Sequence, residues 1–138
     1  LLVYSPEVIV ENGGDIFMKS LKKRLIGIYA GSSPFTGKLA LEIEAADTPL
    51  GICTSSGTVG PSLSLGAADA VITLAASAAL ADTAATAIGN RIMGARDIDF
   101  EIEQAGDKYR LIGLVIIKDD RIGLWGKVKL VSQSGDLS

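Results

Sequence analysis

The chain has 138 residues, of which 48% are hydrophobic and 21% are charged, and its net charge is −3. This composition predicts a single globular domain over residues 1–138 and argues against nucleic acid as the main partner. No apolar run reaches the ~20 residues of a membrane span. Histidine is absent, which excludes a histidine triad, a histidine zinc site and an imidazole general base. The single cysteine, Cys53, excludes an internal disulfide and is typical of a reducing, cytoplasmic compartment.

The chain begins Leu-Leu-Val without a methionine. This start is compatible with a processed product or with a fragment of a longer protein. An upstream part of such a protein could carry a signal peptide.

The first half of the chain is predicted to form strands. The β-branched stretch 7–11 and the stretch 16–19 flank the turn sequence Asn12-Gly-Gly-Asp15, which predicts a hairpin. Its glycines, Gly13 and Gly14, either form a plain turn or let the backbone approach a ligand closely. Further strands are predicted over residues 24–30, 39–45, 50–53 and 69–75.

A loop of small residues follows the strand 50–53 directly. Four of its five residues carry hydroxyl groups: the loop consists of Thr54, Ser55, Ser56, Gly57 and Thr58. Hydroxyls and backbone N–H groups in such a loop can bind an anion, although no lysine follows the glycine as in a Walker A motif. The alternative interpretation is a low-complexity surface loop.

The alanine-rich stretch 77–90 is predicted to form a helix. Ser77 is the candidate N-cap, and Gly89-Asn90 are candidates for a left-handed end. The residues that we expect on its buried face are Leu80, Ala84, Ala87 and Ile88.

Asp82 is the unusual residue of this helix, because a carboxylate in an apolar stretch is costly to desolvate. Thr86 follows one turn later on the same face. A carboxylate and a hydroxyl side by side are candidate ligands for Mg²⁺ or Ca²⁺. The alternative is an Asp82 that faces solvent or accepts hydrogen bonds from a nearby loop.

The last part of the chain adds a second helix and a hairpin. Residues 95–105 fit both a strand and a helix, and we predict a helix because acidic residues flank the apolar positions. The stretch 109–118 is predicted to pair with 121–131, with Gly126 at a bulge. About eight strands lie before the first helix and after the second, which predicts an α+β fold with a largely antiparallel sheet.

Three motifs resemble the ApbE-like proteins, the FAD:protein FMN transferases. Ala81-Asp-Thr-Ala-Ala-Thr86 resembles the metal-binding helix of that family, Asn12-Gly-Gly-Asp-Ile16 its Gly-Gly-Asp segment, and Gly51-Ile-Cys-Thr-Ser-Ser-Gly57 its Thr-Ser-Gly loop. The motifs occur in the family's order and cover roughly residues 7 to 93. The family's histidine-containing segment has no counterpart in Thr58–Gly66, and its N-terminal part has none either. The resemblance therefore indicates the C-terminal portion of an uncharacterised ApbE-like branch.

The resemblance implies a ligand site and its residues. Asp82 and Thr86 would hold Mg²⁺ against the diphosphate of FAD, with FMN as a related ligand. Gly13, Gly14, Asp15 and the loop from Thr54 to Thr58 would contact the nucleotide. No catalytic residue is assigned, since no general base is evident for FMN transfer.

Two other classes of function remain open at this stage. One is a flavin- or nucleotide-binding module that keeps the metal helix without transfer activity. The other is a structural or oligomerisation domain, in which the small-residue helix packs against a partner helix of a homo-oligomer.

Overall fold

The computed structural model describes residues 8–12, 15–28, 30, 33–55 and 68–132. These residues form the α+β fold that the sequence predicts. The strands are β1 (Val8–Asn12), β2 (Asp15–Lys19), β3 (Arg24–Gly27), β4 (Leu39–Ile43), β5 (Leu50–Ser55), β6 (Ala70–Ala75), β7 (Gly113–Lys118), β8 (Arg121–Gly126) and β9 (Leu130–Ser132). The helices are the short 3₁₀ helix η1 (Ala45–Asp47), α1 (Ala78–Gly89) and α2 (Arg96–Lys108). None of these helices is long and apolar enough to cross a membrane.

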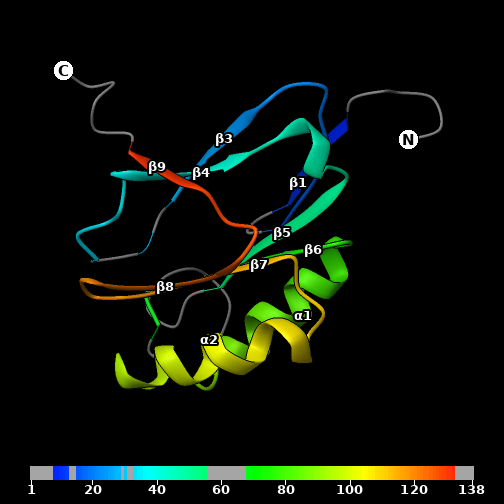
Figure 1. Ribbon diagram of the computed structural model, residues 1–138. Helices are drawn as coiled ribbons and strands as arrows, with labels where there is room; N and C mark the ends of the chain where they lie inside the picture. The colour runs from blue at the N-terminus through cyan, green and yellow to red at the C-terminus, as the bar shows by residue number, and fades with distance from the viewer. Residues whose placement is uncertain (1–7, 13–14, 29, 31–32, 56–67, 133–138) are drawn as a thin grey trace.

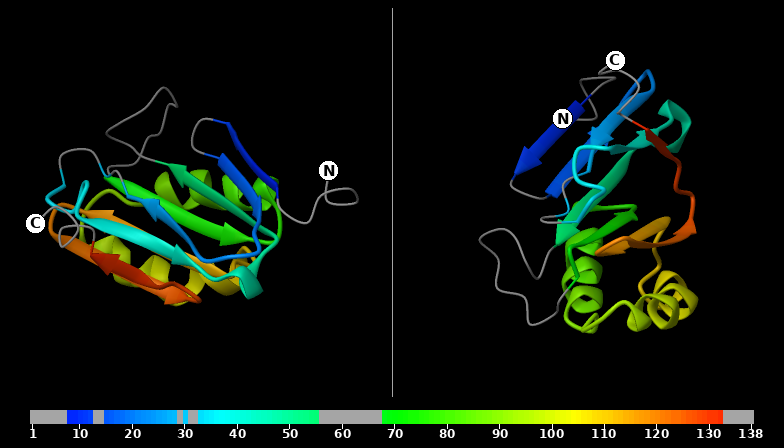
Figure 2. Two further views of the ribbon diagram at one scale, coloured as in Figure 1. Left: turned by 90° about the horizontal axis from the view of Figure 1, so that it is seen from above. Right: turned by 90° about the vertical axis from the view of Figure 1, so that its left-hand side faces the viewer.

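The elements stack in three layers (Figure 1). The middle layer is a six-stranded sheet in the order β1-β2-β5-β6-β7-β8, in which every paired strand is antiparallel. Helices α1 and α2 cover one face of this sheet, with α1 against β5 and β6 and α2 against β7 and β8. The other face is covered by a three-stranded antiparallel sheet in the order β3-β4-β9 (Figure 2).

The central strands of the large sheet are buried on both faces. On β6, Val71 and Ala75 pack in the core beneath the helices, whereas Ile72 and Leu74 pack in the core shared with the small sheet. Successive side chains of a strand point to opposite faces, so one strand contributes to two cores. This double burial explains why the stretch 69–75 is a continuous apolar run rather than an alternating one.

Helix α1 begins as predicted. The Ser77 hydroxyl accepts a hydrogen bond from the backbone N–H of Leu80 at 3.2 Å, which satisfies one of the free donors of the first turn. The predicted left-handed end is wrong, because Asn90 at the C-cap has a φ of −66°. The chain instead continues in a turn in which the N–H of Ile92 donates to the carbonyl of Gly89.

The predicted buried face of α1 is partly wrong. Leu80 is 45% exposed, and the residues buried by packing are Ala81, Ala84, Ala85, Ile88 and Gly89. The reason is the close approach of the helix to the sheet: a Cβ atom at Gly51 on β5 would overlap the backbone of Ser77 and Ala78. Small side chains permit this approach, and the bulkier Leu80 is turned outward. The small-residue face of α1 thus packs on β5 and β6 of the same chain.

The ambiguous stretch 95–105 is helical, as predicted. Ile98 and Ala105 are buried at helical spacing, and Ile102 packs beside them. Phe100, which a strand alternation would place with Ile98 and Ile102, is 62% exposed. The carboxylate of Asp97 accepts hydrogen bonds from the backbone N–H groups just before the helix, at Met93 and Gly94.

The predicted C-terminal hairpin is correct only in its first part. Strand β8 pairs with β7 but ends at Gly126, where φ is +77°. A Cβ atom at Gly126 would overlap the carbonyl of Ile112, so the residue allows a sharp turn rather than a bulge within a longer strand. The chain then crosses to the small sheet, where β9 pairs with β4.

Candidate metal centre

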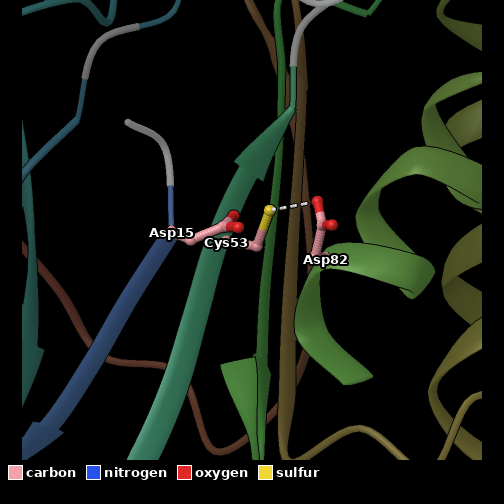
Figure 3. A group of neighbouring side chains, drawn as sticks. All are labelled: Asp15, Cys53 and Asp82. Atoms are coloured by element: carbon pink, nitrogen blue, oxygen red, sulfur yellow. Dashed lines mark hydrogen bonds between the residues drawn. The ribbon is translucent and has the colours of Figure 1, made fainter. Parts of the chain in front are cut away.

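Three side chains from separate elements converge at one end of the large sheet (Figure 3). Asp15 is the first residue of β2, Cys53 lies on β5, and Asp82 lies in the second turn of α1. One possible ligand atom from each side chain lies within 4.8 Å of the others. The two carboxylates approach the sulfur of Cys53 from opposite sides.

The register of the sheet places two of these residues side by side. Asp15 on β2 is paired directly with Cys53 on β5, and Cys53 is paired in turn with Thr73 on β6. Paired residues of neighbouring strands point to the same face. Asp15, Cys53 and Thr73 therefore all face α1, since Cys53 packs in the core beneath the helices.

A hydrogen bond holds α1 over this row of residues. The buried hydroxyl of Thr73 donates to the carbonyl of Ala81 at 2.6 Å. Ala81 immediately precedes Asp82, so this contact positions the turn that carries the carboxylate. The Cys53 thiol donates to Oδ1 of Asp82 at 3.5 Å.

Burial differs among the three residues of the cluster. Cys53 is only 3% exposed, Asp15 is half-buried, and Asp82 is exposed. The thiol therefore forms the floor of the site, and the carboxylates reach solvent.

The electrostatic environment keeps Cys53 neutral. Burial raises the pKa of the Cys53 thiol well above its usual range, and the hydrogen bonds and negative charges of Asp15 and Asp82 raise it further. A thiolate is the form that ligates a metal or acts as a nucleophile. At neutral pH the side chain is thus a hydrogen-bond donor, and the carboxylates are the groups available to a cation.

The predicted site residues are placed as follows. Asp15 and Asp82 lie together in the cluster, and Thr54 and Ser55 follow Cys53 on β5, with Thr54 exposed and Ser55 half-buried. Thr86 is exposed on α1, one turn after Asp82, and its role as a second metal ligand stays a prediction. The predicted residues outside the described part of the chain are Gly13, Gly14, Ser56, Gly57 and Thr58.

Sequence reasoning missed Cys53 as a member of the site. The available signal was its position directly before Thr54, within one of the motifs. Its contact with Asp15 depends on the pairing register of β2 with β5, and a sequence does not show which residues of two strands are opposite each other.

A second charged group, also missed, lies away from this centre. Glu101 on α2 is 1% exposed, and its Oε1 lies 3.6 Å from Nη1 of Arg91. Arg91 also donates to the Tyr109 hydroxyl at 2.6 Å, and Gln104 donates to Oε2 of Glu101 at 3.0 Å. These contacts tie the connection between the helices to α2, which is a structural role.

Comparison with known proteins identifies the family. A family model described as "AbpE bacteria" matches residues 2–107. The chain belongs to this family. Similar proteins include a UPF0280 protein of Methanothrix thermoacetophila, 44% identical over 120 residues that make up 87% of this chain and 50% of the relative. A UPF0280 protein of Methanosarcina acetivorans is 40% identical over 127 residues, which make up 91% of this chain and 50% of the relative.

These relatives are longer than this chain. A UPF0280 protein of Methanococcus aeolicus, 42% identical over 125 residues, is likewise matched over 88% of this chain and 50% of its own length. The chain therefore spans about half the length of the curated relatives it matches.

The match corrects the resemblance drawn from the sequence motifs. Neither the AbpE family model nor these UPF0280 relatives are described as FAD:protein FMN transferases. The assignment to the ApbE-like transferases was therefore wrong. The short motifs with Gly-Gly-Asp, Thr-Ser-Gly and Asp82 are made of small and polar residues, which recur in turns and helix surfaces for local structural reasons.

Proposed function

We propose that this chain binds a divalent cation, Mg²⁺, through Asp15 and Asp82, and that the cation binds the diphosphate of a nucleotide. The observation that carries the proposal is the convergence of the two carboxylates, from distant parts of the sequence, around Cys53 with ligand atoms within 4.8 Å of each other. Two carboxylates so close repel each other, and a bound cation relieves that repulsion.

The ligand types favour a hard cation. Mg²⁺ is bound in proteins by one or two carboxylates together with water and phosphate oxygens. The Cys53 thiol is buried and donates a hydrogen bond to Asp82, so the oxygen ligands at the site come from the two carboxylates. Thr86, exposed one turn after Asp82, is a candidate for a further oxygen ligand.

A nearby hydroxyl group supports a phosphate ligand. Ser55 lies two residues after Cys53 on β5, points to the same face of the sheet and is half-buried, whereas Thr54 between them points to the opposite face. Hydroxyl groups donate hydrogen bonds to phosphate oxygens, while the cation neutralises their charge. FAD is one nucleotide with a diphosphate, and ADP has the same group without the flavin. The proposal is one of binding and assigns no reaction.

Calorimetric titration tests the proposal with Mg²⁺ alone, and then with FAD and ADP in the presence and absence of Mg²⁺. We expect both nucleotides to need Mg²⁺. The variants Asp15→Asn and Asp82→Asn remove one ligand charge each and should weaken Mg²⁺ binding by about 10-fold or more, which corresponds to ~1.4 kcal/mol.

Asp99→Asn is the matched control, because Asp99 is exposed on α2 and lies outside the cluster. It should bind Mg²⁺ as the unmodified chain does. If all three variants bound Mg²⁺ equally, the cluster would not be the cation site. If FAD bound but ADP did not, the diphosphate would not be the recognised group.

A further inference from the structure

One edge strand of each sheet lines the same groove. β1 is the last strand of the large sheet, and β3 is the last strand of the small sheet. Within the described residues each has one paired neighbour, so each presents one edge without a neighbouring strand. Residues of both strands line one groove, so the two strands lie near each other.

A groove lies between the hairpin of β1 and β2 on one side and β3 on the other. It has a volume of about 300 Å³, and its lining includes Ile9 of β1, Met18 of β2 and Leu25 of β3. Ile9 and Met18 are directly paired across the hairpin, so they form one apolar surface. Glu11 and Arg24 also line the groove and give it charges of both signs.

The described side chains of β1 are exposed on both faces of the strand. Ile9 is 48% exposed and its neighbour Val10, which points to the opposite face, is 46% exposed. The helices lie over β5 to β8 rather than over β1. Leu25 on β3 is 58% exposed. Apolar side chains gathered along an open strand edge are typical of a surface that binds another polypeptide.

The length of the relatives indicates what this polypeptide is. The chain matches only about half of each UPF0280 relative, so those proteins contain about as much again of further chain. The groove is an exposed surface of the matched half on which part of that further chain can pack.

We propose that the free edge of β3 and the exposed face of β1 bind an extended segment from the further half of the full-length protein. The segment adds a fourth strand to the small sheet, as in other cases of strand addition. Its inward side chains then cover Ile9, which is 48% exposed. This inference does not rest on the proposed cation site.

A second copy of the chain fits the groove less well. A two-fold dimer formed through β1 or through β3 pairs one strand with its own copy. Such a pairing satisfies one edge and leaves the other strand and the groove between them open. A strand added to β3 lies over β1 and covers both.

Hydrogen–deuterium exchange tests the proposal on proteins as they exist. The full-length Methanothrix thermoacetophila relative is compared with the 138-residue chain, and each peptide is corrected for its intrinsic exchange rate. We expect the peptide aligned with β3 to exchange at least ~10-fold more slowly in the full-length relative, because its edge amides gain partners. The peptide aligned with β7, which is central in both proteins, serves as the reference. Equal protection of β3 in the two proteins overturns the proposal.

Light scattering after size exclusion tests the second copy as occupant. We expect the 138-residue chain to be a monomer, and Leu25→Asp to leave its mass unchanged. A dimer that Leu25→Asp converts to a monomer assigns the groove to a second copy and overturns the proposal. Leu124→Asp is the control, since Leu124 is 46% exposed on β8 at the other end of the large sheet.

Discussion

Strands β7 and β1 both contain a short apolar run rich in β-branched residues, but the two runs have different surroundings. The run Leu114 to Ile117 on β7 is fully buried between the helices and the small sheet. The run Val8 to Val10 on β1 is equally β-branched, yet Ile9 and Val10 are each about half exposed. An apolar run therefore predicts a strand, but the layers around it decide whether its side chains stabilise the fold.

The largest effect on the free energy of unfolding is expected from truncating a buried leucine of β7. Leu114→Ala should lower the free energy of unfolding by about 2–5 kcal/mol, because Leu114 is completely buried and its loss leaves a cavity. The matched change Leu25→Ala, at a leucine 58% exposed near the open edge, should change it by less than ~0.5 kcal/mol. Urea unfolding measures both. Similar losses would mean that β3 is covered in solution.

A glycine substitution tests the close contact between helix α1 and strand β5. Gly51→Ala places a methyl group where the backbone of Ser77 and Ala78 lies, so α1 must move away from β5. The expected cost is about 1–3 kcal/mol in thermal or urea unfolding. Gly94→Ala is the control, because nothing lies within 4 Å of its added Cβ atom. Equal stability of the two variants would show that α1 is not held closely on β5.

The buried thiol of Cys53, beneath the two carboxylates, predicts that the free energy of unfolding depends on pH. Folding raises the pKa of Cys53 above its ordinary value of 9.0. The unfolded chain then releases the thiol proton first, so this contribution to stability is complete below pH 9 and is lost as the pH rises further. The slope is about 1.4 kcal/mol per pH unit.

The Cys53→Ala variant should lack this slope when unfolding is followed by urea titration from pH 8 to pH 10.5. The unmodified thiol should also react slowly with iodoacetamide at pH 8 and faster after Asp15→Asn. A fast reaction in the unmodified chain would contradict the buried, neutral thiol.

The smallest effect on the free energy of unfolding is expected from removing the hydrogen bond that positions Asp82. Thr73→Val keeps the shape of the side chain but removes the 2.6 Å bond to the carbonyl of Ala81. The expected loss is about 1 kcal/mol, accompanied by weaker Mg²⁺ binding if the turn shifts. Thr54→Val, at an exposed position of β5, controls for the loss of a hydroxyl without burial. No difference in stability between the two variants would rule out an anchoring role for Thr73.

Local patterns in the sequence determined most of the secondary structure. The alanine-rich stretch predicted α1 with its Ser77 cap, and acidic residues between apolar positions predicted α2. Apolar and β-branched runs predicted the strands of the large sheet. These features follow from backbone preference and side-chain periodicity, which involve neighbours in the chain.

Only the tertiary structure decided what meets at the candidate site and at the open edge. Asp15 faces Cys53 because of the register of β2 on β5, and Asp82 joins them because Gly51 lets α1 lie close to that strand. The crossing of the chain to β9 after Gly126 likewise depends on the small sheet being there to receive it. Register, layer packing and strand crossing are contacts between distant residues. Their energies depend on which surfaces meet, and no local pattern records that choice.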